Sequence, residues 1–366
     1  MRDVPESFSA WSDGARALAA MLVVASHARD VVMVDYPHRS GWLAFYAVTG
    51  PGHSGVILFF VLSGFWIGRA VWRRRAAQAF WQDYAVDRLT RLGIVLLPAL
   101  LLTGALDTLG LHGLHLPLYA GRTGAHSLTE NVAATLGSWV FVGNLVFLQT
   151  IAVPPFGSNG PLWSLAWEFC YYLWFPALVL SLARRRPSPA LAALAAAFFN
   201  PALLGGFACW LSGWLLFIAV ARGRRLPRAA PAAAALLFLA LLAASGARRQ
   251  GWTDLPLAIG FALLLFTLAQ SGRRLPRWLA PLAAFGRRAS FSLYAIHYPI
   301  IALAGGWLTG PARLAPSPVA VLWVLGLFAL CLAAAWLFAA QTEARTGWLR
   351  ARLRPGAAAG RLATTP

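Results

Sequence analysis

Residues 318–340 read PVAVLWVLGLFALCLAAAWLFAA and contain no charged side chain. An apolar run of about 20 residues is long enough to cross the hydrocarbon core of a bilayer as an α-helix. Similar runs recur along the chain, in which 59% of the 366 residues are hydrophobic and 12% are charged. Lipid offers no hydrogen-bond partner to an open strand, so each run must be helical. The sequence therefore predicts an all-α polytopic integral membrane protein.

The arginines predict how these helices are threaded through the membrane. All 31 basic residues are arginine, and most lie in short bursts that flank the apolar runs. Because cytoplasmic loops carry an excess of basic residues, we expect about ten crossing helices with both termini in the cytoplasm. This layout leaves outside only Arg29, Arg39, Arg122, Arg248, Arg249 and Arg313. The predicted spans are 14–34, 54–72, 92–110, 162–183, 189–204, 206–221, 230–246, 255–271, 289–306 and 318–340, with a tight turn at Gly205-Gly206 between the fifth and the sixth.

The apolar segment 131–152 is expected to behave differently from these spans. It carries the polar residues Asn131, Asn144 and Gln149. If it crossed the bilayer, the arginines at 184–186 would fall outside and break the bias of basic residues. We therefore expect a re-entrant or outward-facing apolar helix here.

The basic charge does not indicate a nucleic-acid partner. The formal net charge is +19, but the arginines are divided among short bursts beside apolar runs and do not form the basic groove that binds nucleic acid. The expected partner is the lipid bilayer. The chain then consists of a transmembrane domain, 1–341, and a basic cytoplasmic tail, 342–366, that is expected to be disordered.

Ionisable side chains within a span are rare and mark functional sites. Arg16 and His27 lie in the first span with ten residues between them. Eleven helical steps return to within about 20° of the starting direction and rise about 16 Å, so both residues share one stripe of the helix. This arrangement favours a shared path, with Arg16 near the cytoplasmic face and His27 in the outer half. In the structural alternative, Arg16 extends its charge to the interface and His27 only packs.

A second cluster lies near the outer end of the span 162–183. Ser164 and Glu168 share one helical face, because they are one turn apart. A carboxylate beside aromatic rings suits a sugar, whose apolar faces stack on rings. The aromatic residues alone could also form an interfacial belt, whereas a carboxylate in an apolar span favours function. The aromatic residues of the adjacent stripe are Trp163, Trp167 and Tyr171.

Three further features are weak when each is taken alone. Ser63 precedes a glycine in the second span, a pair that permits close approach between helices. Arg88 and Arg91 stand at the cytoplasmic entrance of the third span, where guanidinium groups could hold phosphates or only anchor the orientation. His297 lies in the middle of a span, two residues before Pro299, which frees backbone carbonyls nearby.

Taken together, these motifs resemble the acyltransferase-3 family, the bacterial membrane O-acyltransferases that modify O-antigen, exopolysaccharides, Nod factors and some macrolides. The resemblance covers nearly the whole chain, residues 10–340, and it is specific because five motifs occur in the family's order. The motifs are Arg16-x10-His27, Phe59-Phe60-Val61-Leu62-Ser63-Gly64-Phe65, Asp87-Arg88-x-x-Arg91, Leu162-Trp163-Ser164-Leu165-x-x-Glu168 and Ser292-Leu293-Tyr294-x-x-His297.

The resemblance implies an O-acyltransferase in the inner membrane of a bacterium. Its donor substrate would be acyl-CoA, most often acetyl-CoA, with no bound cofactor and no metal. The head of the donor would bind at the cytoplasmic mouth near Arg16, Arg88 and Arg91. Its pantetheine arm would pass Ser63 and thread inward, over a length similar to the separation of Arg16 from His27.

The resemblance also implies roles for His27, Glu168 and His297 in catalysis. His27 would deprotonate the acceptor hydroxyl or briefly carry the acyl group, since an imidazole titrates near neutral pH. Glu168 and His297 would orient His27 or bind acceptor hydroxyls. The acceptor, a carbohydrate or glycolipid, would enter from the outer side. Its expected contacts are Trp163, Ser164, Trp167 and Tyr171.

The alternative class is a transporter or flippase that moves a glycan or lipid-linked substrate without making a bond. Polar residues at mid-membrane would serve such a pathway equally well. Transporters of this kind are often built from internal repeats with paired broken helices. The sequence shows neither feature, which favours the enzyme.

Overall fold

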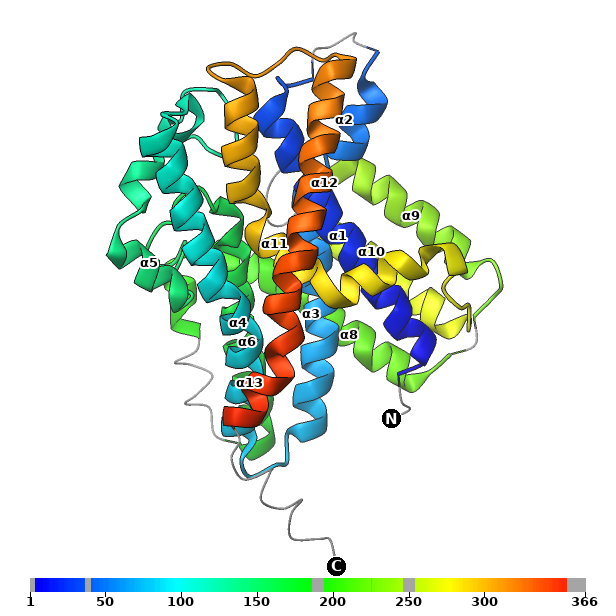
Figure 1. Ribbon diagram of the computed structural model, residues 1–366. Helices are drawn as coiled ribbons and strands as arrows, with labels where there is room; N and C mark the ends of the chain where they lie inside the picture. Colours follow the sequence, from blue (N-terminus) through cyan, green and yellow to red (C-terminus); the bar gives the residue numbers. More distant parts are fainter. Residues whose placement is uncertain (1–3, 37–40, 186–193, 225, 246–253, 354–366) are drawn as a thin grey trace, which may run out of the picture.

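The computed structural model describes residues 4–36, 41–185, 194–224, 226–245 and 254–353, and within these ranges the chain is helical and forms no strand (Figure 1). The α-helices are α1 (Glu6–Val32), α2 (Leu43–Thr49), α3 (Gly52–Arg74), α4 (Phe80–Thr108), α5 (Ser138–Leu145), α6 (Trp163–Arg184), α8 (Ala202–Arg222), α9 (Ala230–Ser245), α10 (Asp254–Gln270), α11 (Ala280–Thr309), α12 (Pro318–Gln341) and α13 (Thr346–Leu353). A π-helical turn covers Leu109–Gly113, and 3₁₀ turns cover Pro117–Ala120, Val132–Thr135, Gly160–Leu162, Leu194–Phe198, Arg277–Leu279 and Glu343–Arg345.

Six helical stretches among the described residues are long and apolar enough to cross a bilayer. α1 has 27 residues but carries ionisable side chains along its length, whereas α9 and α10 have 16 and 17 residues. The prediction of an all-helical, multi-pass membrane protein is therefore confirmed, and the number of crossings and the side of the termini stay predictions. The six stretches are Leu43–Arg74, Phe80–Gly113, Gly160–Ala183, Ala202–Arg222, Arg277–Thr309 and Pro318–Leu353.

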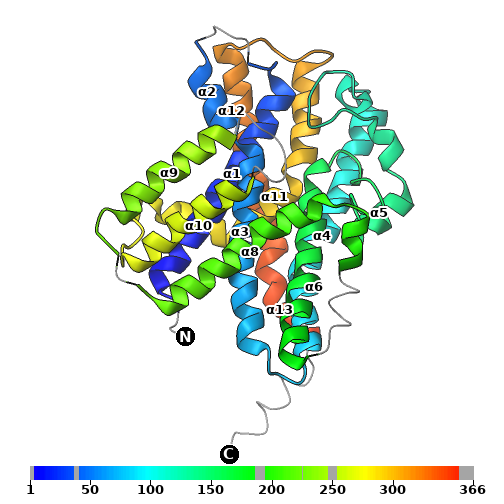
Figure 2. The same cartoon turned by 180° about the vertical axis from the view of Figure 1, so that it is seen from behind.

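α1 lies in the middle of the bundle, where it packs against α11, α3 and α12 (Figures 1 and 2). α3 also packs closely against α8, through two glycines that face each other. A Cβ atom on Gly64 would clash with the carbonyl oxygen of Trp210, and one on Gly213 would clash with that of Val61. The expectation that Gly64 permits close helix approach is therefore confirmed.

The predicted turn at Gly205-Gly206 is wrong, because α8 continues through both residues. Both glycines are buried, and a Cβ atom on Gly206 would clash with the hydroxyl of Tyr171 and the indole of Trp167. Gly206 therefore makes room for aromatic side chains of α6, and the glycine pair does not reverse the chain.

The span predicted at 189–204 is not one continuous helix. Residues 194–198 form a 3₁₀ turn and α8 begins only at Ala202. The three residues between them are not in a helix. The first part of the predicted span, 189–193, lies outside the described residues.

The apolar segment 131–152 does not cross a bilayer as a helix. Its longest helix, α5, has eight residues and rises about 12 Å, less than half of the roughly 30 Å hydrocarbon core. The side chain of Asn144 is used locally, since it donates to the carbonyl of Pro154 (2.9 Å) and accepts from the amide of Phe156 (3.0 Å). The segment therefore folds back beside α4, and its polar residues hold that fold.

The beginning of the expected disordered tail is helical. Residues 343–353 form a 3₁₀ turn and α13, which pack against α4. Arg350 pairs with Asp87 at 3.0 Å, and the second carboxylate oxygen of Asp87 accepts a hydrogen bond from Arg74 at 2.7 Å. These ion pairs hold the start of the tail on the bundle, whereas residues 354–366 lie outside the described part of the chain.

Candidate active site

Two cavities lie inside the bundle, and most of the predicted site residues line one of them. The larger, here called the arginine-lined cavity, has a volume of about 470 Å³ and lies between α1, α3, α4, α6 and α11. Four arginines against two carboxylates leave its wall with an excess of positive charge, which suits phosphate groups. The charged lining residues are Asp13, Arg16, Arg88, Arg91, Glu168 and Arg287.

The predicted donor-binding arginines are brought together in this cavity and are held by neighbours. Arg16 donates to Asp13, one turn earlier on α1, at 3.0 Å. The guanidinium of Arg88 lies over the ring of Tyr172, 5.9 Å from its centroid. A guanidinium has five N–H groups, so contacts of this kind orient each side chain and leave donors for a ligand.

Ser63, Ser164 and Glu168 also line the arginine-lined cavity. Tyr172 donates its hydroxyl proton to Glu168 at 2.7 Å. Glu168 therefore faces the arginines, and among the described contacts it makes none with His27. The proposed orienting role of Glu168 toward His27 has no geometric support, and a role in the arginine-lined cavity fits its position better.

The second cavity, here called the histidine-lined cavity, has a volume of about 310 Å³. Three imidazoles line it, those of His27, His53 and His126, together with the indole of Trp163. The rings of His53 and Trp163 are nearly parallel, with 6.3 Å between their centroids. Trp163 therefore lies in the wall of this cavity, and its role in acceptor binding stays a prediction.

The other two predicted acceptor-binding aromatics take structural positions. Trp167 packs edge-on against Trp163 at 4.7 Å and donates to the hydroxyl of Thr150 at 3.2 Å. Tyr171 is fully buried and donates to the carbonyl of Leu203 at 3.0 Å. Neither residue lines the two cavities.

One polar pair at the histidine-lined cavity was not predicted from the sequence. His53, near the start of α3, donates from Nε2 to Asp254 in the first turn of α10, at 2.8 Å. The Asp254 side chain is 5% exposed. The sequence does place an imidazole and a carboxylate at the ends of two predicted spans. It does not indicate that they are in contact, because they are 201 residues apart.

His27 and His297 form a hydrogen-bonded pair that fixes which nitrogen of His27 is available. His297 Nδ1 lies 2.8 Å from the carbonyl oxygen of Tyr294. A carbonyl only accepts, so Nδ1 of His297 carries the proton and its Nε2 is an acceptor when the ring is neutral. His27 Nδ1 lies 2.9 Å from that Nε2 and must donate to it. Nε2 of neutral His27 therefore keeps a free lone pair, the state required of a general base.

Tyr294 stands between the two cavities. Among the described residues that line them, it alone belongs to both walls. Its hydroxyl donates to the carbonyl of Pro161 at 2.5 Å, and the hydroxyl of Ser164 lies 2.5 Å away. Since the phenol has one proton, Ser164 is the donor in the second contact. The backbone carbonyl of Tyr294 accepts the hydrogen bond from His297, so Tyr294 connects the boundary between the cavities to the imidazole pair.

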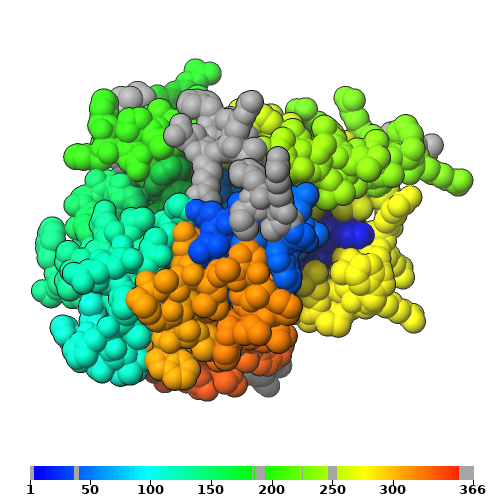
Figure 3. Space-filling view, turned by 90° about the horizontal axis from the view of Figure 1, so that it is seen from above, coloured from blue at the N-terminus to red at the C-terminus, as the bar shows by residue number. Residues whose placement is uncertain are grey.

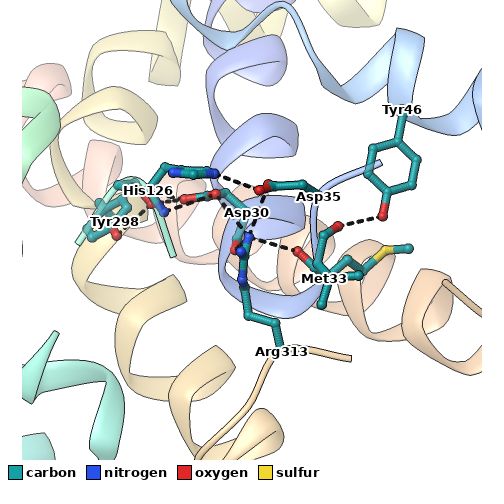
Figure 4. A network of polar contacts seen from close by, with 9 residues as sticks. Asp30, Met33, Asp35, Tyr46, His126, Tyr298 and Arg313 are labelled. Atoms are coloured by element: carbon teal, nitrogen blue, oxygen red, sulfur yellow. Dashed lines mark hydrogen bonds and ion pairs between the residues drawn. The ribbon is translucent and has the colours of Figure 1, made fainter. Parts of the chain in front are cut away.

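A polar network closes the end of the bundle near His27 (Figure 4). Asp30, on α1, accepts from the amide and hydroxyl of Ser127 at 2.8 and 2.5 Å. Tyr298 donates to the same hydroxyl at 2.8 Å. Figure 3 views this end, where the connection between α11 and α12 (orange) lies beside the segment after α4 (cyan). Asp30 thus fixes the loop around Ser127 over the histidine-lined cavity.

Asp30, Asp35 and His126 lie close enough together to hold a metal ion. Arg313 already lies 3.6 Å from Asp30 and 3.3 Å from Asp35. Burial would raise the pKa of Asp35, but the hydrogen bond from His126 and the charge of Arg313 outweigh it, so this pKa lies below its ordinary value. The cluster is explained as an ion-pair network that joins the loops at this end.

The fold and the site define an all-helical, multi-pass membrane protein with an oriented imidazole beside two internal cavities. The chain matches the model of the acyltransferase-3 family, described as an acyltransferase domain, over residues 9–340. No curated protein and no solved structure matches it. The chain therefore belongs to the acyltransferase-3 family, which confirms the resemblance seen in the motifs. It is a membrane-bound acyltransferase.

Proposed function

We propose that this protein transfers an acyl group, most simply acetyl, from acyl-CoA to a hydroxyl of a carbohydrate or glycolipid. The observation that carries the proposal is the arrangement of the two cavities. One is cationic and suits the phosphates of CoA, the other contains His27 beside an aromatic platform, and Tyr294 separates them. The donor thioester and the acceptor hydroxyl would meet at this boundary, so neither substrate would have to cross the membrane.

The donor would bind in the arginine-lined cavity. Arg16, Arg88 and Arg91 supply charge-assisted hydrogen bonds to phosphate oxygens, and Ser63 lines the same wall. The thioester end of the pantetheine arm would then point toward Tyr294 and the histidine-lined cavity. A cytoplasmic donor fits the expected orientation, in which the arginine-rich ends of the helices lie inside.

The acceptor would bind in the histidine-lined cavity, where Trp163 offers a ring face and His53 a polar edge. Nε2 of His27 would accept the proton of the acceptor hydroxyl while the hydroxyl oxygen attacks the thioester carbonyl carbon. The carbon–sulfur bond then breaks, and the proton on His27 passes to the departing thiolate. Family membership and this oriented base favour acyl transfer over a transport pathway.

The proposal is tested with membranes that contain the protein and with acetyl-CoA labelled in the acetyl group. The label should appear covalently on extracted glycan or glycolipid, with release of one thiol for each acetyl transferred. His27→Ala should abolish both signals. His112→Ala, which changes an exposed histidine outside both cavities, should retain them and serves as the matched control. Full transfer by His27→Ala would overturn the proposed mechanism.

A further inference from the structure

Tyr294 is held at the boundary between the cavities by a rigid setting. Its side chain is 6% exposed, and its ring packs edge-on against Phe59 with 5.7 Å between centroids. Its hydroxyl donates to the carbonyl of Pro161 and accepts from Ser164. The O–H bond therefore has one defined direction in the resting protein, toward a carbonyl oxygen.

The loop that supplies this carbonyl is pinned on both sides. Asn159 donates to the hydroxyl of Thr103 at 3.0 Å and to the carbonyl of Ala295 at 2.9 Å. Ser158 donates from its amide and its hydroxyl to Asp107, at 2.6 and 2.7 Å. Because α4 and α11 both hold the loop, the hydroxyl of Tyr294 is aimed by the fold and not by a mobile segment.

Attack of a hydroxyl on a thioester places negative charge on the carbonyl oxygen, and enzymes that transfer acyl groups stabilise this oxygen with preorganised donors. The arginines that line the larger cavity face the part assigned to the phosphates of the donor. Tyr294 belongs to the walls of both cavities, and its hydroxyl and the adjacent hydroxyl of Ser164 are donors at this position.

We infer that Tyr294, assisted by Ser164, is the oxyanion donor of the reaction, an inference that rests on the proposed function. In the resting protein the carbonyl of Pro161 accepts the hydrogen bond that the thioester oxygen would accept during the reaction. When the donor is bound, the Tyr294 O–H turns to the thioester oxygen and stabilises the charge formed as the acceptor oxygen bonds to the carbonyl carbon. The hydrogen bond from Ser164 polarises the phenol and makes it a stronger donor. The charge returns to sulfur when the carbon–sulfur bond breaks.

The test separates the hydroxyl from the ring. Tyr294→Phe keeps the aromatic packing and should lower kcat for label transfer from acetyl-CoA by about 100- to 1000-fold, the loss expected for one oxyanion donor. The KM for acetyl-CoA should stay within about twofold, because an interaction made only in the transition state leaves ground-state binding unchanged. Tyr46→Phe is the matched control, since Tyr46 also donates to a backbone carbonyl, that of Val34 at 2.7 Å, and it should keep the wild-type rate.

Ser164→Ala provides a second measurement should Tyr294→Phe not fold. It leaves every aromatic ring in place and should lower kcat by about tenfold, the effect of one lost hydrogen bond. A wild-type kcat in either folded variant overturns the inference, as does a loss confined to the KM for acetyl-CoA. In both cases the proposed function stands as long as the wild-type protein transfers label. Absence of transfer by the wild-type protein instead overturns the proposed function and the inference with it.

Discussion

Replacing His297 by alanine would remove the group that orients His27 and leave the arginine-lined cavity unchanged. The bond between the two rings is 2.9 Å long and part-buried, and loss of such a bond with its partner left in place costs about 1–3 kcal/mol. About 1.4 kcal/mol corresponds to a factor of ten in rate. Acyl transfer should therefore slow by about 10- to 100-fold.

The assay is the initial rate of label transfer from acetyl-CoA to membrane glycan, normalised to the amount of folded protein and measured over a range of donor concentrations. The loss should appear in kcat, with little change in the KM for acetyl-CoA. His297→Gln is the informative companion variant, because its amide can donate to the carbonyl of Tyr294 and its oxygen can accept from Nδ1 of His27. It should recover part of the activity that the alanine variant loses.

Retention of the wild-type rate by His297→Ala would refute the assignment of His297 as a positioning residue. Failure of His297→Gln to recover any of the activity that His297→Ala loses would likewise contradict the orientation argument, because the glutamine side chain can restore both hydrogen bonds.

Three other predictions address binding, packing and pH. Arg16→Ala should raise the KM for acetyl-CoA while the dependence on acceptor concentration stays the same; equal donor kinetics in variant and wild type would contradict the phosphate-binding role. Gly64→Ala should destabilise the fold by about 1–3 kcal/mol, because the new methyl group meets the Trp210 carbonyl. An unchanged midpoint of thermal unfolding in detergent would contradict the close packing of α3 on α8. The pKa of Asp35 lies below its ordinary value of 3.8. Its contribution to stability is therefore present above about pH 4 and is lost as pH falls through the lowered pKa. Asp35→Asn should reduce the acid sensitivity of unfolding, and identical pH profiles of unfolding in variant and wild type would contradict this.

The helical membrane architecture was readable from the sequence because it depends on one strong physical constraint, that backbone groups in lipid must bond within their own helix. The prediction that segment 131–152 does not cross the bilayer followed from a second constraint, the distribution of arginine along the chain. The turn at Gly205-Gly206 failed because a glycine pair can reverse a chain or admit a bulky neighbour. Only the position of Tyr171 on another helix decides between the two.

The site was predictable where its residues lie on one helix and hidden where it depends on tertiary contacts. The common stripe of Arg16 and His27 follows from helical periodicity, but the bond from His27 to His297 joins positions 270 residues apart. The position of Glu168 shows the same limit, because helical spacing places it near Ser164 without saying which cavity it faces. Tyr294 belongs to one of the motifs but had no predicted role, because its importance comes from lining both cavities, which only the tertiary structure shows.

The position of Tyr294 between the two cavities also bears on how such an enzyme can work in a membrane that maintains an ion gradient. A protein that is hollowed from two directions risks a leak of protons or other ions, which would dissipate the gradient on which the cell depends. Here the two cavities share Tyr294 as a wall residue, and its hydroxyl is held by the carbonyl of Pro161 in the pinned loop. In the proposed reaction only the acyl group passes Tyr294, as one covalent bond is exchanged for another. Acyl transfer therefore does not require an open path for ions across the membrane.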